Sequence, residues 1–110
     1  MKLVKRGIKK EDITLAKRYA KWYKVIDNEI RVILNESSRV SKNSVANNVD
    51  YKNDKAYLCV TDLEGSKKFY EKHKDLELRL YVKADVGSLY NEYKVNDWYV
   101  NEEGLEIDLA

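Results

Sequence analysis

The chain has one histidine and one cysteine, the side chains most often used for acid–base and nucleophilic catalysis. His73 lies between Lys72 and Lys74, and two positive neighbours lower the pKa of an imidazole and are typical of an exposed helix end. Cys59 lies in the apolar run 56–60, where a thiol stays protonated and packs as a small apolar group. We therefore expect neither residue to be catalytic, although the sequence alone leaves a Cys–His pair open.

Carboxylates offer a second kind of chemistry. Asp62, Glu64 and Glu77 loosely resemble the acidic arrangement of restriction-type nucleases, in which two carboxylates hold Mg²⁺ and activate water. Those enzymes use a lysine where this chain has Arg79, which cannot give up its proton. Asp62 and Glu64 also suit the start of a helix. A metal-dependent nuclease is therefore the third of our hypotheses. The sequence has no phosphate-loop, dinucleotide, zinc or nucleophile-elbow motif. We expect a protein that is not an enzyme and has no cofactor or metal.

Charge is sorted by position along the chain. Residues 1–24 contain nine Lys and Arg against two carboxylates, and residues 84–110 contain seven carboxylates against one Lys. The net charge of +2 hides this separation, which points to charged partners. The candidate basic site comprises Lys5, Arg6, Lys9, Lys10, Lys17, Lys21 and Lys24. The candidate acidic site comprises Asp97, Glu102, Glu103, Glu106 and Asp108.

Each charged block also has an explanation without a partner. The lysines could form an ordinary solvated helix face. The carboxylates of Glu106 and Asp108 could be neutralised within the fold, if residues 2–6 pair with residues 105–109 and place lysines opposite them. Aromatic contacts would favour binding because tyrosine is enriched at interface hot spots. The candidate aromatic contacts are Tyr90, Tyr93 and Tyr99.

Composition limits the class of protein. A length of 110 residues with 44% hydrophobic and 36% charged residues predicts one globular domain over residues 1–110. No apolar run is long enough to cross a membrane. A single cysteine excludes an intrachain disulfide and favours a reducing, cytoplasmic setting. The abundance of Lys, Asn and Tyr is typical of AT-rich genomes, including those of many viruses and plasmids.

The elements that would position these residues begin with a helix from Asp12 to Ile26. Leu15, Tyr19 and Trp22 precede Ile26 at helical spacing. Asp12 would cap the helix, and the lysines of the helix would face outward. Residues 30–34 are β-branched and favour a strand, although a continued helix stays open. Residues 35–55 are rich in Asn, Ser and Lys and predict a long loop.

The second half of the chain predicts a sheet. The run 56–60 indicates a central strand, buried on both faces, and Thr61 with Glu64 forms a capping box for a helix that ends near His73. Residues 76–82 alternate as a strand, which permits a parallel crossover with the strand at 56–60. Residues 87–93 indicate a loop or helical turn. Residues 94–100 and 105–109 then indicate a hairpin around Gly104, and Leu3 and Val4 could add another strand.

These elements predict an α+β fold. It would have a mixed four- or five-stranded sheet, an amphipathic N-terminal helix packed on one face and a C-terminal β-hairpin. We expect a small non-enzymatic interaction protein, a viral or mobile-element inhibitor of a host complex. It would bind a host protein, or a second copy of itself as a homodimer, through its charged and tyrosine-rich surface. The alternative is a nucleic-acid-binding protein that uses the basic helix face. We expect no membrane partner.

Overall fold

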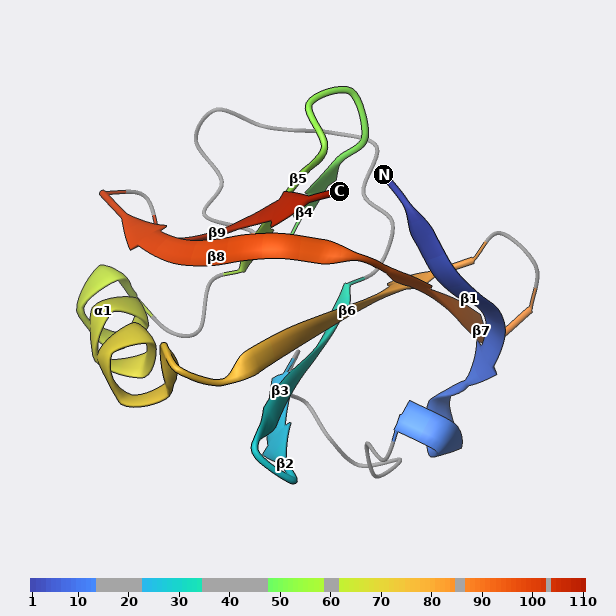
Figure 1. The fold of residues 1–110 in the computed structure, drawn as a ribbon, viewed down its shortest axis with the longest axis horizontal. Coiled ribbons are helices and arrows are strands. Elements are labelled where there is room, and N and C mark those ends of the chain that lie inside the picture. The colour runs from blue at the N-terminus through green and yellow to red at the C-terminus, as the bar shows by residue number, and fades with distance from the viewer. Residues whose placement is uncertain (14–22, 35–47, 59–61, 85–86, 103) are drawn as a thin grey trace.

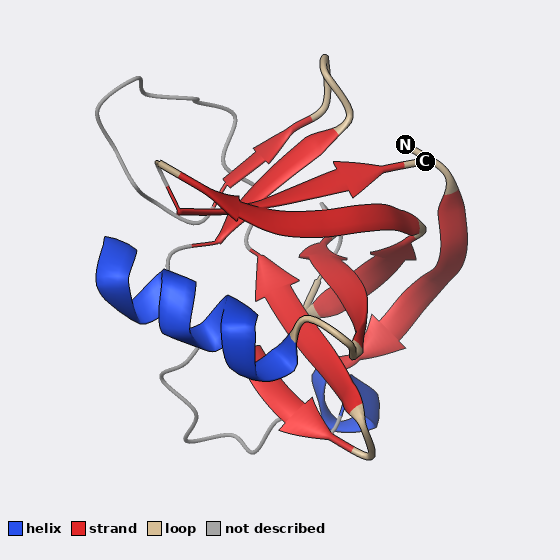
Figure 2. Cartoon of the chain, turned by 60° about the vertical axis from the view of Figure 1, so that its left-hand side comes forward, coloured by secondary structure: helices blue, strands red, loops and turns tan. Residues whose placement is uncertain are grey.

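In this computed structural model, the residues described are 1–13, 23–34, 48–58, 62–84, 87–102 and 104–110. They form two β-sheets, one α-helix and a short 3₁₀ turn (Figures 1 and 2). The predicted α+β class is confirmed, with a mixed five-stranded sheet and a C-terminal hairpin. The predictions about Lys17, Lys21, Cys59, Thr61 and Glu103 fall outside the described residues.

The five-stranded sheet joins the two halves of the chain. Its strands lie in the order β1 (Leu3–Lys9), β7 (Leu89–Tyr93), β6 (Glu77–Lys83), β3 (Glu29–Leu34) and β2 (Tyr23–Ile26). β3 and β6 run parallel, and the other neighbours run antiparallel. The strand predicted at residues 30–34 is therefore confirmed, but its parallel partner is β6. The parallel crossover that the order of residues 56–60 and 76–82 permitted does not form, because β5 and β6 belong to different sheets.

The four-stranded sheet is antiparallel and contains the predicted C-terminal hairpin. Its strands lie in the order β4 (Asn48–Asp50), β5 (Lys55–Leu58), β9 (Gly104–Leu109) and β8 (Val95–Asn101). Gly104 has a φ of 132°, a conformation that favours glycine at this turn. The predicted loop over residues 35–55 is wrong at its end, where β4, a turn and the first residue of β5 lie. β5 is central, but it is buried on alternate residues only.

The main core lies between the two sheets and is closed by α1 (Leu63–His73). Alternate residues of β3, β6 and β9 point into it, and Phe69 of α1 packs beside them. Leu105, Ile107 and Leu109 of β9 are buried, as period-two alternation predicts. A smaller cluster on the opposite face of the five-stranded sheet comprises Ile8, Ile13, Ile33, Tyr81 and Tyr90. β5 and β7 bury alternate residues, β3 and β6 contribute buried residues to both clusters, and β2 has no buried residue.

The predicted N-terminal helix is wrong at both of its described ends. Lys10–Ile13 forms a 3₁₀ turn that contains Asp12, and Tyr23–Ile26 forms β2. β2 pairs with β3 through a tight turn at Asp27 and Asn28, which have φ values of 52° and 63°. Asp and Asn tolerate this left-handed conformation, which two-residue hairpin turns require. Hairpin pairing therefore outweighs the helical spacing of the apolar residues.

Two further predictions are corrected. Residues 89–93 form β7 between β1 and β6, where a loop or helical turn was predicted. Alternation of buried and half-buried residues in β7 was hidden because its buried positions include a glutamate, Glu92. α1 is capped by Asp62, one residue after the predicted cap, and the Asp62 carboxylate accepts the Gly65 amide at 2.7 Å. The predicted end near His73 is confirmed.

Candidate protein-binding surface

β1 is an edge strand with exposed cations. It pairs only with β7 within the described ranges, and its buried side chain is that of Ile8. Register shifts interrupt its ladder on both sides of Lys5, and the Gly7 amide donates to the Asn91 side chain at 3.2 Å. These bulges make β1 a poor template for another strand. The exposed side chains of Lys5, Arg6 and Lys9 instead give β1 a positively charged surface.

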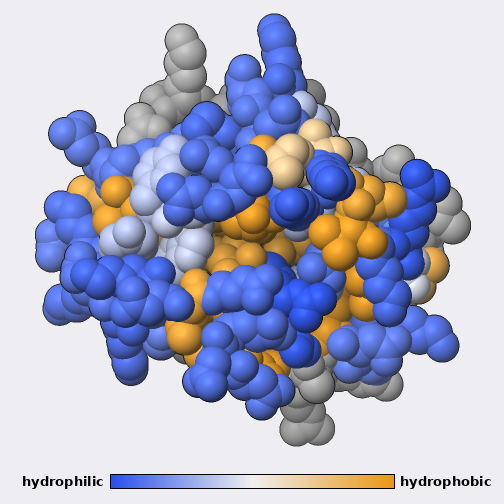
Figure 3. All heavy atoms as spheres, in the orientation of Figure 1, coloured by the Kyte–Doolittle hydropathy of each residue, from blue (hydrophilic) through white to orange (hydrophobic). Residues whose placement is uncertain are grey.

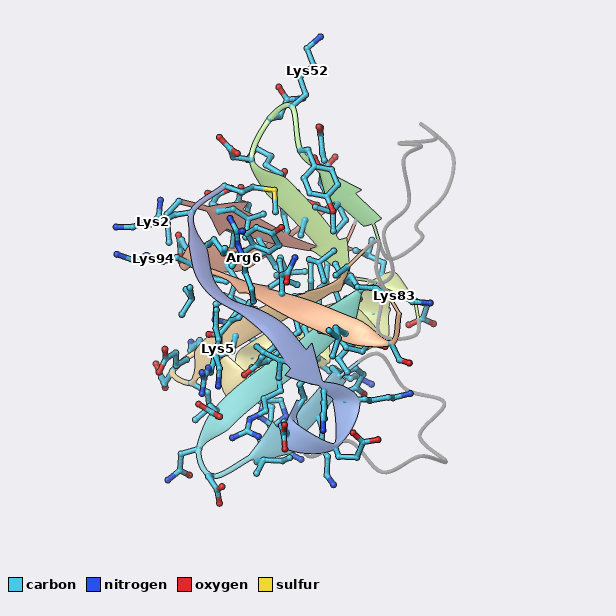
Figure 4. All side chains as sticks on the ribbon, turned by 90° about the vertical axis from the view of Figure 1, so that its right-hand side faces the viewer. Lys2, Lys5, Arg6, Lys52, Lys83 and Lys94 are labelled. Carbon is cyan, nitrogen blue, oxygen red and sulfur yellow. The ribbon has the colours of Figure 1, made fainter. Side chains whose placement is uncertain are left out.

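Exposed cations gather along β1 and at Lys94. Figure 4 shows Lys2 just before β1 and Lys5 and Arg6 on it, with the Lys94 side chain extending beside that of Lys2. The main chains of Lys2 and Lys94 are joined by a hydrogen bond of 2.8 Å. We call this set the basic edge; it comprises Lys2, Lys5, Arg6, Lys9 and Lys94, all of them exposed. No ion pair to a carboxylate is formed by any of them within the part of the chain that the structure describes.

The other predicted basic residues lie elsewhere. Lys10 belongs to the 3₁₀ turn and is half-buried. Lys24 lies on β2 opposite Arg31 of β3, and not on a helix. The helix face predicted to bind nucleic acid is therefore not formed at Lys24.

The acidic hairpin is partly neutralised by a lysine from the neighbouring strand. Lys55 Nζ of β5 lies 2.8 Å from Asp108 and 3.4 Å from Glu106. The hydrogen bond from Lys55 lowers the pKa of Asp108, and the Tyr99 hydroxyl also donates to Asp108 at 3.1 Å. Cross-strand neutralisation thus occurs, but through β5. The pairing of residues 2–6 with residues 105–109, considered as an alternative, does not form, because β1 pairs with β7 and β9 pairs with β5 and β8.

The remaining acidic residues do not form one ridge. The Asp97 carboxylate accepts the main-chain amide of Trp98 at 2.8 Å. Glu106 accepts the Asn101 side chain at 2.9 Å in addition to its contact with Lys55. Glu102 is exposed near the hairpin turn. The structure therefore brings together only part of the predicted acidic site.

The three candidate tyrosines are less accessible than expected. Tyr90 is 7% exposed and belongs to the small cluster, and Tyr93 is half-buried against the main core. Tyr99 is half-buried, and its hydroxyl contacts Asp108 and Lys55. Burial and the nearby carboxylates raise the pKa of Tyr99. Tyr90 is therefore not available as an aromatic contact in this structure, because β7 turns it inward.

The residues considered for catalysis have structural contacts. Arg79 donates to both carboxylate oxygens of Glu92, at 2.8 and 3.1 Å, and this contact raises the pKa of Arg79. Glu29 lies 3.5 Å from Arg79 and 2.6 Å from Arg31. These ion pairs cross β3, β6 and β7 on the outer face of the sheet. Within the described ranges, no group of three or more His, Cys, Asp or Glu residues could hold a metal ion.

His73 has a packing role. Its ring meets that of Phe69 edge-on, with centroids 4.7 Å apart. Burial, and then the charge of Lys72, lower the pKa of His73. The predicted direction of the pKa shift is confirmed, but the main cause is burial rather than the neighbouring lysines. The Cys–His pair stays untested because Cys59 lies outside the described residues.

A groove next to the basic edge is a site that sequence reasoning missed. It has a volume of about 620 Å³ and lies between the beginnings of β6 and β8, with exposed Val4 of β1 at one side. Figure 3 shows apolar side chains at the bottom of a hollow in this face, surrounded by charged ones. Its apolar lining comprises Val4, Leu76, Leu78, Tyr93, Val95 and Trp98. No sequence signal marks it, because it forms where the chain passes from one sheet to the other.

Comparisons of the chain with protein-family models, with curated proteins and with solved structures found no significant match. None of the described helices has the length and apolar character needed to cross a membrane.

Proposed function

We propose that this chain is a non-enzymatic interaction protein that binds an acidic segment of a partner protein at the basic edge. The observation that carries the proposal is that the acidic hairpin forms internal ion pairs and the described part of the basic edge does not. Lys55 neutralises Glu106 and Asp108 within the fold, whereas the basic edge has no carboxylate partner in the described ranges. Cations without internal partners are available to an acidic surface, which they attract and orient.

Apolar surface beside the charge favours a protein as the partner. Val4 is 54% exposed among the cations, and it borders the groove with its apolar bottom. Protein interfaces combine an apolar centre with a polar rim. Single-stranded nucleic acid would instead require exposed aromatic rings for base stacking, and β1 has no aromatic residue. Composition alone supports the further proposal that the protein, viral or plasmid-borne, blocks a host complex.

Duplex nucleic acid is the second candidate, because phosphates could neutralise the same cations. Extended β1 spreads Lys5, Arg6 and Lys9 along the edge of the sheet, and each phosphate contact would release counterions. This interface differs from the predicted helix face, since it is formed by a strand.

The test is a matched pair of charge reversals. The first variant, Lys5→Glu with Lys9→Glu, reverses two charges of the basic edge. The control variant, Lys67→Glu with Lys68→Glu, reverses two exposed lysines of α1, which lies far from β1 (Figure 1). A random peptide display library is selected on the unaltered protein, and the Kd of enriched peptides is measured by fluorescence anisotropy. We expect acidic peptides, weakened roughly tenfold by the first variant through lost charge attraction and unchanged by the second.

Labelled DNA duplex serves as the parallel probe. Absence of acidic peptides, or equal weakening by both variants, contradicts the proposal. Duplex binding that falls steeply with salt, is lost in the β1 variant and occurs without peptide binding would assign the surface to nucleic acid instead.

A further inference from the structure

The groove exists because one strand pairing stops early. The ladder between β6 and β7 ends at Leu80 and Tyr93, and the chain then continues through Lys94 into β8 of the other sheet. β6 itself begins three residues earlier, at Glu77, and there it pairs only with β3 among the described strands. Among the described strands, β8 lies at the edge of its own sheet and pairs only with β9. Two strand edges therefore border the groove.

The main chain of Val95 points into this groove. Leu109, its partner on β9, donates its own amide to the Asp54 carbonyl on the far side. In an antiparallel ladder, residues of a pair that is not hydrogen-bonded both turn their N–H and C=O outward. The N–H and C=O of Val95 therefore point away from β9, toward the groove that Val95 lines.

The same alternation applies to β6. Ala84 donates to the Leu89 carbonyl at 2.9 Å, so this pair is a hydrogen-bonded one. Every second residue of β6 before Ala84 turns its main-chain N–H and C=O toward the β7 side. Leu78 is one of these residues, and it lies beyond Leu80, where the ladder with β7 ends. The main-chain carbonyl of Leu76, just before β6, already has a partner, because the Trp98 indole donates to it at 3.3 Å.

Asp97 covers the next outward amide of β8. Its carboxylate accepts the Trp98 N–H at 2.8 Å, and Asp97 is exposed. A side chain that binds the edge of its own strand occupies the position where the carbonyl of an added strand would lie. The Asp97 side chain can leave this position without disturbing the core, because it is exposed.

We propose that the groove binds the acidic partner segment in an extended conformation, as a strand added to the edge of β8. This inference rests on the proposed function and specifies how the partner is held. Val95 would supply main-chain hydrogen bonds, and the partner would displace the Asp97 carboxylate from the Trp98 amide. An extended chain alternates its side chains, so apolar residues would face Leu78 and Trp98 while acidic ones face Lys5 and Lys94.

Charge at one end of the groove favours an acidic occupant. The charged residues of its lining balance in number, with Lys74, Arg79 and Lys94 against Glu77, Glu92 and Asp97, and Arg79 is paired with Glu92. Lys94 lines the groove, and Lys2 extends beside it (Figure 4). Neither lysine forms an ion pair with a carboxylate within the described ranges. Strand addition takes its affinity from main-chain bonds and its specificity from alternate side chains, and both requirements are met here.

The first test is a capped peptide in which Glu and Val alternate, compared with the same peptide N-methylated at alternate residues. Methylation removes main-chain donors but preserves charge and side chains. We expect it to weaken binding roughly tenfold or more, and we expect the unmodified peptide to shift the NMR signals of the Val95 amide and the Trp98 indole. Equal binding of both peptides, still sensitive to Lys5→Glu with Lys9→Glu, would retain the proposed function and overturn this inference.

The second test compares Asp97→Ala with Asp97→Asn. Both remove the negative charge, but asparagine keeps an oxygen that can cover the Trp98 amide. We expect the alanine variant to bind the Glu–Val peptide roughly threefold to tenfold more tightly than the asparagine variant, the gain from one exposed hydrogen-bond donor. Identical affinities would mean that Asp97 and the adjacent bulge only prevent edge pairing. Failure of every acidic peptide to bind would instead remove the proposed function itself.

Discussion

Lys55 decides what the acidic residues of the C-terminal hairpin can do. Its ammonium group lies between Asp108 and Glu106, and the hydrogen bonds that Lys55 donates to Asp108 and Tyr99 raise its pKa. The carboxylates of Asp108 and Glu106 therefore form ion pairs within the sheet. Among the residues that the structure describes, the basic edge forms no comparable ion pair, and this difference in single side chains directs the proposal toward β1.

A substitution at Asp108 tests this role through pH. The folded-state pKa of Asp108 is lowered from the ordinary value of 3.8. The ion pair therefore stabilises the fold above pH 3.8, and this stability is lost as the pH falls through the lower, folded pKa. We expect Asp108→Asn to be less stable than the unaltered protein at neutral pH, with the difference closing in acid, as measured by urea unfolding at a series of pH values.

Glu102→Gln is the matched control in the same hairpin, because Glu102 is exposed. It should change stability little at any pH. A loss in Asp108→Asn that stays constant down to the acid limit would contradict the ion pair as its cause.

At the scale of elements, α1 shows how local and distant signals combine. Residues 61–64 indicated a helix start, but Asp62 provides the cap and Phe69 provides the buried contact. A capping side chain accepts a hydrogen bond from only one of the several free amides at a helix start. The helix is also held by aromatic contacts, including Tyr70 against Trp98 with centroids 5.2 Å apart.

Removal of the cap should cost little more than one hydrogen bond. We expect Asp62→Ala to reduce the free energy of unfolding by about 1 kcal/mol, because the Gly65 amide loses its acceptor. Asp62→Asn keeps an acceptor and should lose clearly less. Urea unfolding of both variants measures the difference, and equal losses would show that the carboxylate acts by some contact other than the cap.

For the whole molecule, the main feature is one core shared by both sheets and the helix. Buried residues from β3, β6, β5 and β9 belong to the same cluster, and Phe69 of α1 meets Tyr23 and Trp98 within it. The sheets also meet at the β7–β8 corner, where the groove opens. A core with contributions from every layer predicts that the described elements unfold together.

Phe69→Ala tests this cooperativity. Loss of the buried ring should lower the free energy of unfolding by roughly 3 kcal/mol through lost burial and a cavity, and Phe69→Leu should lower it by less. Unfolding followed by far-UV circular dichroism and by tryptophan fluorescence should remain one coincident transition in both variants. Separate transitions for the two signals would show that the sheets are independently stable.

Prediction from sequence succeeded where one strand's own pattern decides the result. The alternation of residues 76–82 and 105–109 located β6 and β9 and their buried faces, because a strand that covers a core must alternate. It failed at β2, where helical spacing was outweighed by pairing with β3, and at β7, where buried Glu92 disguised the alternation. The groove had no sequence signal, since its two edges are distant in the chain.

The sequence by itself determined the α+β class, the C-terminal hairpin and the separation of charge along the chain. Only the tertiary structure decided which charges are neutralised, that β1 lies beside β7, and that Val95 turns its main chain into a groove. The physical reason is range. Alternation and turn preferences act between near neighbours, whereas the pairing of distant strands depends on the free energy of the whole core.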